Sequence, residues 1–196
     1  MIKPPRILKL GLCVCFCQNF FPAMAAGPDL IVWGEAAAPY VDIVTFTSDH
    51  CEVLEGCAVA GTRKLLRFNM ETRNVGDADL FLGDPATNPL FHWAPCHGHY
   101  HFDGFAQYKL LDGNEPVVQG QKIGFCIEDV HRWDPNAAEF PRYGCNYHGI
   151  QAGWADVYAS TLPCQYIDVT DVPPGEYTLQ LIVNPDQLLP ESDFGN

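Results

Sequence analysis

Basic side chains are scarce in this sequence, in which 11 lysines and arginines stand against 24 aspartates and glutamates for a formal net charge of −13. Such a charge repels phosphate backbones, and no run of Lys and Arg forms a basic stripe, so we expect no nucleic-acid partner. Long apolar runs are also absent after residue 25, where no stretch approaches the roughly 20 residues of a spanning helix. We therefore expect no membrane span in the chain that follows.

A sustained helical period is missing as well. The 196 residues include 16 prolines and 17 glycines, which interrupt the chain too often for long helices and favour short strands joined by turns. The apolar fraction of 47% is sufficient for a packed core, which excludes intrinsic disorder as the main interpretation. The sequence predicts one all-β, sandwich-like domain, rich in loops and with little helix.

Alternating apolar and polar residues indicate where the strands lie. In residues 65–75, Leu66, Phe68 and Met70 alternate with polar side chains, which predicts one half-buried strand with these three on its inner face. Four further strands are predicted at residues 40–46, 105–111, 166–169 and 177–183. The remaining segments 83–98 and 129–163 are predicted to be long loops with functional residues.

The first 25 residues have the pattern of an export signal. Lys3, Arg6 and Lys9 precede an apolar run from Leu10, and Ala23-Met24-Ala25 resembles a cleavage site. We expect the chain to be secreted, or to reach a periplasmic or extracellular compartment, as a mature domain of residues 26–196. Loss of the three basic residues leaves a net charge of −16, which favours a cationic partner.

Six cysteines remain after the signal is removed, and an even number in an exported chain predicts up to three disulfides. Fifteen pairings of six cysteines are possible, and their spacing alone does not choose among them. The six are Cys51, Cys57, Cys96, Cys126, Cys145 and Cys164.

Three histidines at i, i+2 and i+4 form the strongest chemical motif. His97, His99 and His101 would project from one face of an extended chain. On a flat strand the outer two α-carbons would be about 13 Å apart, so binding one ion requires a bend, which Gly98 permits. Three imidazoles without a thiolate favour copper, with zinc as the next choice.

Several segments, taken in order, resemble the lysyl oxidases, a family of copper-dependent amine oxidases. The resemblance extends from about residue 65 to residue 196. It rests on residues 93–101, 124–129, 156–158, 165–172, 183–185 and 189–193. It implies that His97, His99 and His101 are copper ligands. It also implies that Lys122 and Tyr158 form a lysine tyrosylquinone, a cofactor made when the lysine amine adds to the oxidised tyrosine ring.

The resemblance implies an exported enzyme that uses molecular oxygen to deaminate primary amines, including lysine side chains of lysine-rich proteins. The products would be an aldehyde, ammonia and hydrogen peroxide. A base must remove a proton from the substrate, and two residues are candidates. Asp156 lies two positions before Tyr158, on the same side of an extended chain, and His148 is the second candidate.

The chain departs from the better-known animal members of this family at several positions. Those members have a histidine where this chain has Ala94, and two more cysteines at the positions of Arg132 and Trp154. With that pair absent, the resemblance implies the disulfides Cys51–Cys96, Cys57–Cys164 and Cys126–Cys145. The family also continues past the position of Asn196, which implies a fragment or a minimal form of the catalytic domain.

Two other functions compete with the amine oxidase. One is a copper-binding, disulfide-rich β-domain without a quinone, acting as a metal carrier or an adhesive module. In that case Lys122 would be a solvated loop lysine and Tyr158 a core tyrosine. The other is a zinc hydrolase that uses the same three histidines, although no glutamate base accompanies them at a motif spacing.

Overall fold

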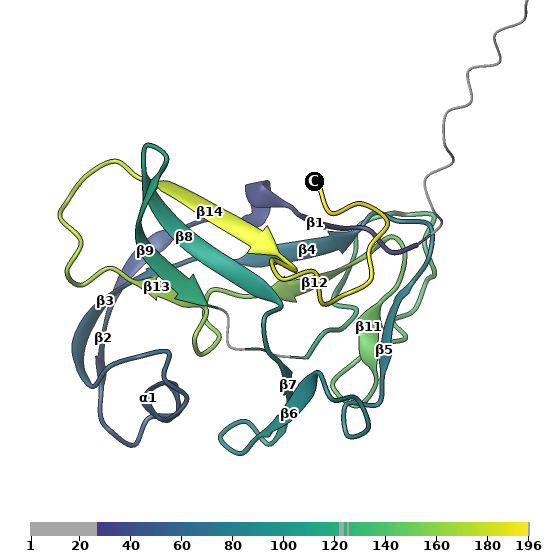
Figure 1. Cartoon of the computed structure of the whole chain (residues 1–196), viewed down its shortest axis with the longest axis horizontal. Helices are drawn as coiled ribbons and strands as arrows, with labels where there is room; N and C mark the ends of the chain where they lie inside the picture. The colour runs from purple at the N-terminus through teal and green to yellow at the C-terminus, as the bar shows by residue number, and fades with distance from the viewer. Residues whose placement is uncertain (1–26, 122–123, 125, 196) are drawn as a thin grey trace, which may run out of the picture.

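The computed structural model describes residues 27–121, 124 and 126–195, and this part of the chain is nearly all β. The predicted all-β fold with little helix is confirmed (Figure 1). The described residues include only two short helical segments, η1 (Gly34–Ala36) and α1 (Cys51–Leu54). None of their helices is long and apolar enough to cross a membrane. The predicted signal, residues 1–25, lies outside the described residues.

Five small antiparallel sheets make up the fold (Figure 1). The first has the order β1 (Leu30–Val32), β4 (Met70–Asn74), β12 (Trp154–Tyr158), β10 (His131–Arg132). The second has the order β13 (Tyr166–Asp168), β3 (Gly61–Arg67), β2 (Tyr40–Phe46), and the third β14 (Thr178–Val183), β8 (Ala106–Asp112), β9 (Glu115–Gln121). Two pairs complete the set, β5 (Leu80–Gly83) with β11 (His148–Ile150), and β6 (Phe91–Ala94) with β7 (His99–Phe102).

All five sheets contribute side chains to one hydrophobic core. Buried core residues include one or more from each sheet, among them Met70, Leu80, Phe102, Tyr108 and Ile167. No sheet of two to four short strands buries enough apolar surface to be stable alone. The sheets therefore depend on one another, and the core links them into one domain.

The strand predictions are confirmed in four places and wrong in one. Residues 40–46 form β2, and β8, β13 and β14 agree with their predictions to within a residue at each end. Residues 65–75, predicted as one strand, are divided between β3 and β4, which belong to different sheets. The chain changes sheet at Asn69, whose side chain donates to Ala36 O and accepts from the Ser160 N–H.

This break also changes which side chains are buried. Phe68 and Met70 are fully buried, as predicted, and Leu66 is partly buried against the same core. The fully buried residue of β3 is instead Leu65, so the predicted inner face was wrong in part. A single alternation cannot continue through a corner at which the chain leaves one sheet for another.

The two predicted long loops are also wrong in part. Strand β6 lies within residues 83–98, and β10, β11 and β12 lie within residues 129–163. These strands have two to five residues, and polar side chains such as His148 and Asp156 are buried in them. Short length and buried polar residues together hide the apolar alternation on which strand prediction depends.

Three disulfides connect parts of the fold that are distant in sequence. Cys51 is bonded to Cys96, Cys57 to Cys164 and Cys126 to Cys145, with Cα–Cα distances of 5.7, 5.6 and 4.8 Å. These are the pairs that the family resemblance implied. The first fastens α1 to the β6–β7 hairpin, and both elements lie on the lower side of Figure 1.

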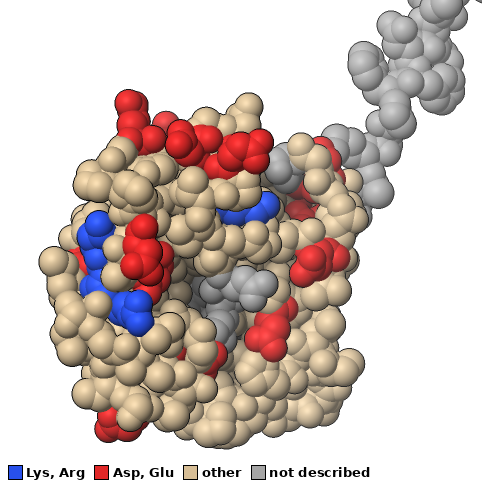
Figure 2. Space-filling view, turned by 60° about the vertical axis from the view of Figure 1, so that its left-hand side comes forward, with Lys and Arg blue, Asp and Glu red and all other residues tan. Residues whose placement is uncertain are grey.

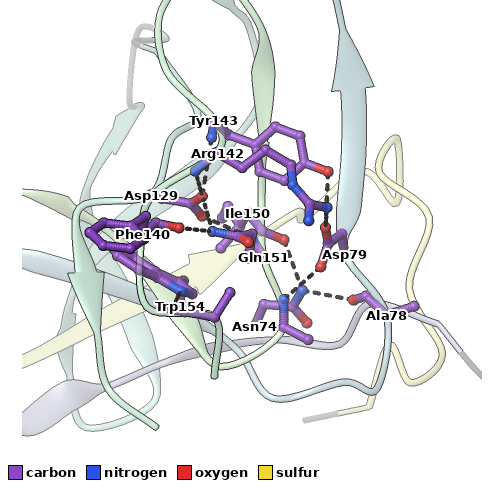
Figure 3. Close-up of polar contacts among 12 residues, drawn as sticks. Asn74, Ala78, Asp79, Asp129, Phe140, Arg142, Tyr143, Ile150, Gln151 and Trp154 are labelled. Carbon is purple, nitrogen blue, oxygen red and sulfur yellow. Dashed lines mark hydrogen bonds and ion pairs between the residues drawn. The ribbon is translucent and has the colours of Figure 1, made fainter. Parts of the chain in front are cut away.

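A buried carboxylate organises the chain between residues 129 and 151 (Figure 3). Asp129 accepts hydrogen bonds from the backbone N–H groups of Arg142 (2.8 Å), Tyr143 (3.1 Å) and Gln151 (2.8 Å). The Gln151 side-chain amide donates a fourth bond at 2.8 Å. One charged side chain therefore satisfies donors from two separate parts of an irregular segment.

A second group of polar contacts extends this network (Figure 3). Asp79 accepts from the Arg142 guanidinium at 2.5 Å, from the Tyr143 hydroxyl at 3.1 Å and from the Ala152 N–H at 3.1 Å. The Asn74 amide donates to the carbonyl oxygen of Ile150 at 3.0 Å. These contacts join the segment to Asn74 at the end of β4 and to Asp79, which immediately precedes β5.

Replacing Asp129 by Ala should reduce the free energy of unfolding by at least about 3 kcal/mol, because four donors lose their acceptor in a largely buried site. Chemical unfolding with the disulfides intact measures this change. The matched control is Asp171→Ala, which removes an exposed carboxylate and should change stability by no more than about 0.5 kcal/mol. Equal effects of the two substitutions would contradict the role of Asp129.

Candidate functional site

The β6–β7 hairpin carries the three predicted histidines. Its turn is closed by the N–H groups of His97 and Gly98, which donate to the Ala94 carbonyl at 3.1 and 2.9 Å. Gly98 has φ +69°, a conformation that glycine adopts readily, and so it provides the predicted bend. His97 consequently lies in the turn, whereas His99 and His101 lie in β7.

The bend brings the three imidazole rings together. Ring centroids are 5.7 Å apart for His97 and His99, 5.1 Å for His97 and His101, and 5.0 Å for His99 and His101. The Nε2 atoms of His99 and His101 are 3.2 Å apart. Nevertheless, within the described part of the chain no three His, Cys, Asp or Glu groups are arranged to hold a metal ion.

Glu55 lies beside this cluster and was missed by sequence reasoning. It caps the C-terminal end of α1, and its Oε2 accepts a hydrogen bond from His97 Nε2 at 2.9 Å. The His97 and Glu55 side chains are only 13% and 15% exposed. The spacing of Cys51 and Cys57 around Glu55 is a signal that could have found it, because both disulfides tie this segment to other parts of the fold.

The types of donor, three imidazoles, suit a divalent copper or zinc ion, and the spacing of one pair among them also fits. With metal–nitrogen bonds of about 2.0–2.1 Å, adjacent ligand atoms on one ion are about 2.8–3.4 Å apart. The Nε2 atoms of His99 and His101 are separated by such a distance. Glu55 Oε1 is buried and has no hydrogen-bond partner among the described residues, and a nearby cation would offset its burial.

The fourth histidine near the cluster is His92, which sequence reasoning also missed. It pairs across the hairpin with His101, at a ring distance of 5.7 Å. Its Nδ1 lies 2.9 Å from Asp103, and both side chains are about half exposed or more. His101 is buried, and burial followed by the charge of His97 lowers the pKa of His99. The cluster therefore has a buried side near β7 and an exposed side at His92.

Strand β12 supplies Tyr158 and Asp156, both buried. The Tyr158 hydroxyl donates to the Cys126 carbonyl at 2.7 Å, and its ring packs edge-on against Phe105 at 5.7 Å. Burial raises the pKa of Tyr158 well above its usual value, and the charge of Asp156 and a hydrogen bond with it raise this pKa further. The two side chains therefore interact, as expected for positions i and i+2 of one strand.

Lys122 lies outside the described residues, but the chain on both sides of it is described. Strand β9 ends at Gln121, which pairs with Gln107. Gly124 is buried so close to Phe102 that a Cβ there would overlap the Phe102 backbone. Phe102 follows His101, and the Cys126 carbonyl accepts the Tyr158 hydroxyl. The described residues that follow Lys122 thus contact both the histidine hairpin and Tyr158.

Glu128 is a further acidic group near the tyrosine. Burial raises the pKa of Glu128, and the charge of Asp129 raises it further. Its own charge contributes to the raised pKa of Tyr158. In the sequence Glu128 is one residue of the segment 124–129 that resembles the family, and a lone glutamate has no pattern that predicts its spatial neighbours.

His148, the second candidate base, is fully buried in β11. Its ring packs against Phe91 at 4.4 Å, and its Nδ1 accepts the Ile127 N–H at 2.9 Å. Burial lowers the pKa of His148 to about 4, and the charge of His99 contributes. An accepting Nδ1 requires that the neutral ring carry its hydrogen on Nε2.

An apolar cavity of about 310 Å³ lies apart from these groups. Residues of β2, β3, β8 and β14 line it together with the segment before β14, including Val41, Lys64, Leu110, Pro173 and Leu179. Its described lining includes none of the predicted site residues. Cavity size therefore does not identify the site, whereas the clustering of titratable side chains does.

Comparisons with known proteins agree with the motifs. A family model described as lysyl oxidase matches residues 43–196. The human protein-lysine 6-oxidase is 34% identical over 209 residues, covering 99% of this chain and 48% of the human protein. The pig protein-lysine 6-oxidase is 35% identical and covers 99% of this chain and 80% of the pig protein. The zebrafish lysyl oxidase homolog 3B is 36% identical and covers 92% of this chain and 24% of that relative. The chain thus spans about half the length of the human relative.

The pKa of His148 leads to a prediction about stability in the metal-free protein. The folded chain keeps this ring neutral down to about pH 4, whereas the unfolded chain takes up a proton near pH 6.5. Stability should therefore fall as the pH is lowered from about 6.5 toward about 4 and level off below that range. Urea unfolding across this range should show a smaller loss in His148→Gln than in wild type. His131→Gln, which changes an exposed histidine, is the control and should lose stability as wild type does. Parallel plots of unfolding free energy against pH for wild type and His148→Gln would refute the prediction.

Proposed function

Because the chain belongs to the lysyl oxidase family, we propose that it is an exported copper-dependent amine oxidase. It would convert primary amines to aldehydes with release of ammonia and hydrogen peroxide. The observation that carries this proposal is the contact of Gly124 with Phe102. Phe102 belongs to the hairpin of three converging histidines, and Gly124 belongs to the segment that follows Lys122. The same segment accepts the Tyr158 hydroxyl at the Cys126 carbonyl.

The residues that would hold the cofactors are those that the family resemblance implied. His97, His99 and His101 would bind copper, and Lys122 and Tyr158 would form the lysine tyrosylquinone. When bound, copper and the quinone together supply a two-electron oxidation of the amine, with molecular oxygen as the final acceptor. Support comes from the convergence of the three imidazole rings, from the 3.2 Å separation of the His99 and His101 Nε2 atoms, and from the buried, oriented phenol of Tyr158.

The protein surroundings would control the orientation of the Tyr158 ring. The Cys126 carbonyl holds the hydroxyl, Phe105 contacts the ring edge-on, and the disulfide to Cys145 fixes the carbonyl's own position. Burial on this scale limits access of bulk water to the ring. A fixed ring and a water-poor site would favour the proposed oxidation of the amine over competing hydrolysis.

Asp156 is the better of the two candidate bases. Its buried carboxylate interacts with Tyr158, so it lies next to the group on which the amine would react. His148 has its lone-pair nitrogen, Nδ1, already engaged by the Ile127 N–H, which leaves Nε2 to donate rather than accept. A base needs an available lone pair within hydrogen-bond reach of the proton, and Asp156 meets this requirement more directly.

The substrate class is inferred from charge and from the names of the relatives. Two of the similar proteins are named protein-lysine 6-oxidases, which indicates peptidyl-lysine as their substrate. This chain carries a net charge of −13, and acidic side chains outnumber basic ones on the face in Figure 2. Such a surface attracts lysine-rich proteins and small cationic amines. Three disulfides also suit an oxidising compartment outside the cytosol.

Lys122→Arg should abolish peroxide release from butylamine and from a lysine-rich protein, because a guanidinium remains protonated and cannot add to an oxidised ring. Tyr158→Phe should have the same effect because it removes the oxidisable phenol. A coupled peroxide assay measures both variants, and Lys109→Arg and Tyr177→Phe are the matched controls.

The same proteins separate an amine oxidase from a metal carrier without quinone. Copper-loaded wild type should react with phenylhydrazine and yield a peptide in which Lys122 and Tyr158 are cross-linked, and neither variant should do so. Full activity in Lys122→Arg, or a wild type that lacks the cross-link, would rule out the proposed cofactor.

His99→Ala should lose copper, because the remaining two imidazoles cannot hold the ion against dialysis. The measurement is copper content per chain after dialysis, with His131→Ala as the control because His131 is exposed and contacts Glu71 instead. Stoichiometric copper in His99→Ala would show that the hairpin is not the metal site.

A further inference from the structure

The contact between Glu55 and His97 determines which nitrogen of His97 carries hydrogen. A carboxylate can only accept, so the Nε2 atom that lies 2.9 Å from Glu55 Oε2 must be the donor. When the ring is neutral, as metal binding requires, its lone pair is then on Nδ1. The other two histidines are oriented differently, since the Nε2 atoms of His99 and His101 face each other at 3.2 Å.

The position of Glu55 is held by covalent bonds. Cys51, the first residue of α1, is bonded to Cys96, which immediately precedes His97. The Glu55 N–H donates to the Cys51 carbonyl at 2.8 Å, and Cys57 is bonded to Cys164. The disulfide therefore links the two segments one residue from His97 and one helical turn from Glu55, which keeps the carboxylate close to the imidazole.

We propose that Glu55 is a positioning residue for the metal site, which fixes His97 so that it presents Nδ1 while His99 and His101 present Nε2. Ligating histidines generally donate their second ring N–H to a carboxylate or carbonyl, which orients the ring and increases its basicity. Glu55 serves this purpose for the histidine in the turn. Of the three histidines, His97 is the least constrained by strand pairing, because it lies before β7 begins.

This inference rests on the proposed copper site, but its first test does not require copper. The metal-free protein, labelled with ¹⁵N-histidine, is examined by long-range ¹H–¹⁵N NMR at a pH where the rings are neutral. In wild type, His97 should show a protonated Nε2 and a pyridine-type Nδ1. In Glu55→Gln this preference should weaken, because the amide both donates and accepts. A wild-type His97 with hydrogen on Nδ1 would overturn the assignment.

The second test measures copper(II) affinity by competition with a chelator. Glu55→Gln should weaken binding by about 10–100-fold, the range typical of lost outer-shell partners. Glu52→Gln, which changes another carboxylate of the same helix, is the control and should bind as wild type does. Native disulfide mapping of each variant shows that the fold is retained.

A comparison of the two measurements separates positioning from a general structural effect. If Glu55 acts through His97, the loss of copper affinity in Glu55→Gln should be accompanied by the weakened Nε2 preference of His97 in the metal-free protein. A loss of affinity with the His97 preference unchanged, or wild-type affinity in Glu55→Gln, would overturn the inference and leave the copper site intact. Wild type that binds no copper, with His97 still protonated on Nε2, would instead overturn the proposed function, and the metal role of Glu55 with it.

Discussion

The geometry of the tyrosine side of the site depends on one buried charge, that of Asp129. Its carboxylate gathers four hydrogen bonds from Arg142, Tyr143 and Gln151, and so closes the irregular chain between them. His148 lies inside the closed segment and β12 begins three residues after Gln151. The Asp129 network thus fixes the segment that leads into β12, and the pairing of β12 with β4 then places Asp156 and Tyr158. The four charge-assisted hydrogen bonds offset the cost of burying the Asp129 carboxylate. Removing the carboxylate would leave several buried donors unpaired.

The histidine side is held in a different way, by covalent bonds and a tight turn. The Cys51–Cys96 disulfide fastens the hairpin to α1, and the left-handed Gly98 folds the chain so that rings at i, i+2 and i+4 converge. The two sides meet where Gly124 packs against the backbone of Phe102, a contact that leaves no room for any side chain. A methyl group at that position would push the segment after Lys122 away from the histidines. We therefore regard the absence of a side chain at residue 124 as a requirement of the site as much as of the fold.

Sequence reasoning succeeded where one local rule determines the outcome. The alternation in residues 40–46 gave β2, and the need for a bend within the histidine motif pointed to Gly98. It failed where burial and polarity are combined. His148 and Asp156 lie buried in strands, yet no apolar pattern marks them, because both are polar; His148 is satisfied by the Ile127 N–H, 21 positions away, and Asp156 interacts with Tyr158 of its own strand. Glu55 was overlooked because its contact with His97 spans 42 positions, across two segments that the Cys51–Cys96 disulfide links.

The electrostatics around Tyr158 favour positive charge over negative. Burial, Asp156 and Glu128 all raise the pKa of the phenol, which means that they oppose a phenolate. The same carboxylates stabilise an ammonium group that enters the site, and they raise its pKa. An amine must nevertheless lose its proton before it can act as a nucleophile. In the proposed enzyme Asp156, buried and next to Tyr158, would attract the cation and then accept its proton, two tasks that do not conflict when the proton moves only after the amine has bound. The acidic surroundings would therefore select for amines without preventing the proposed reaction, as long as one carboxylate remains available as the acceptor.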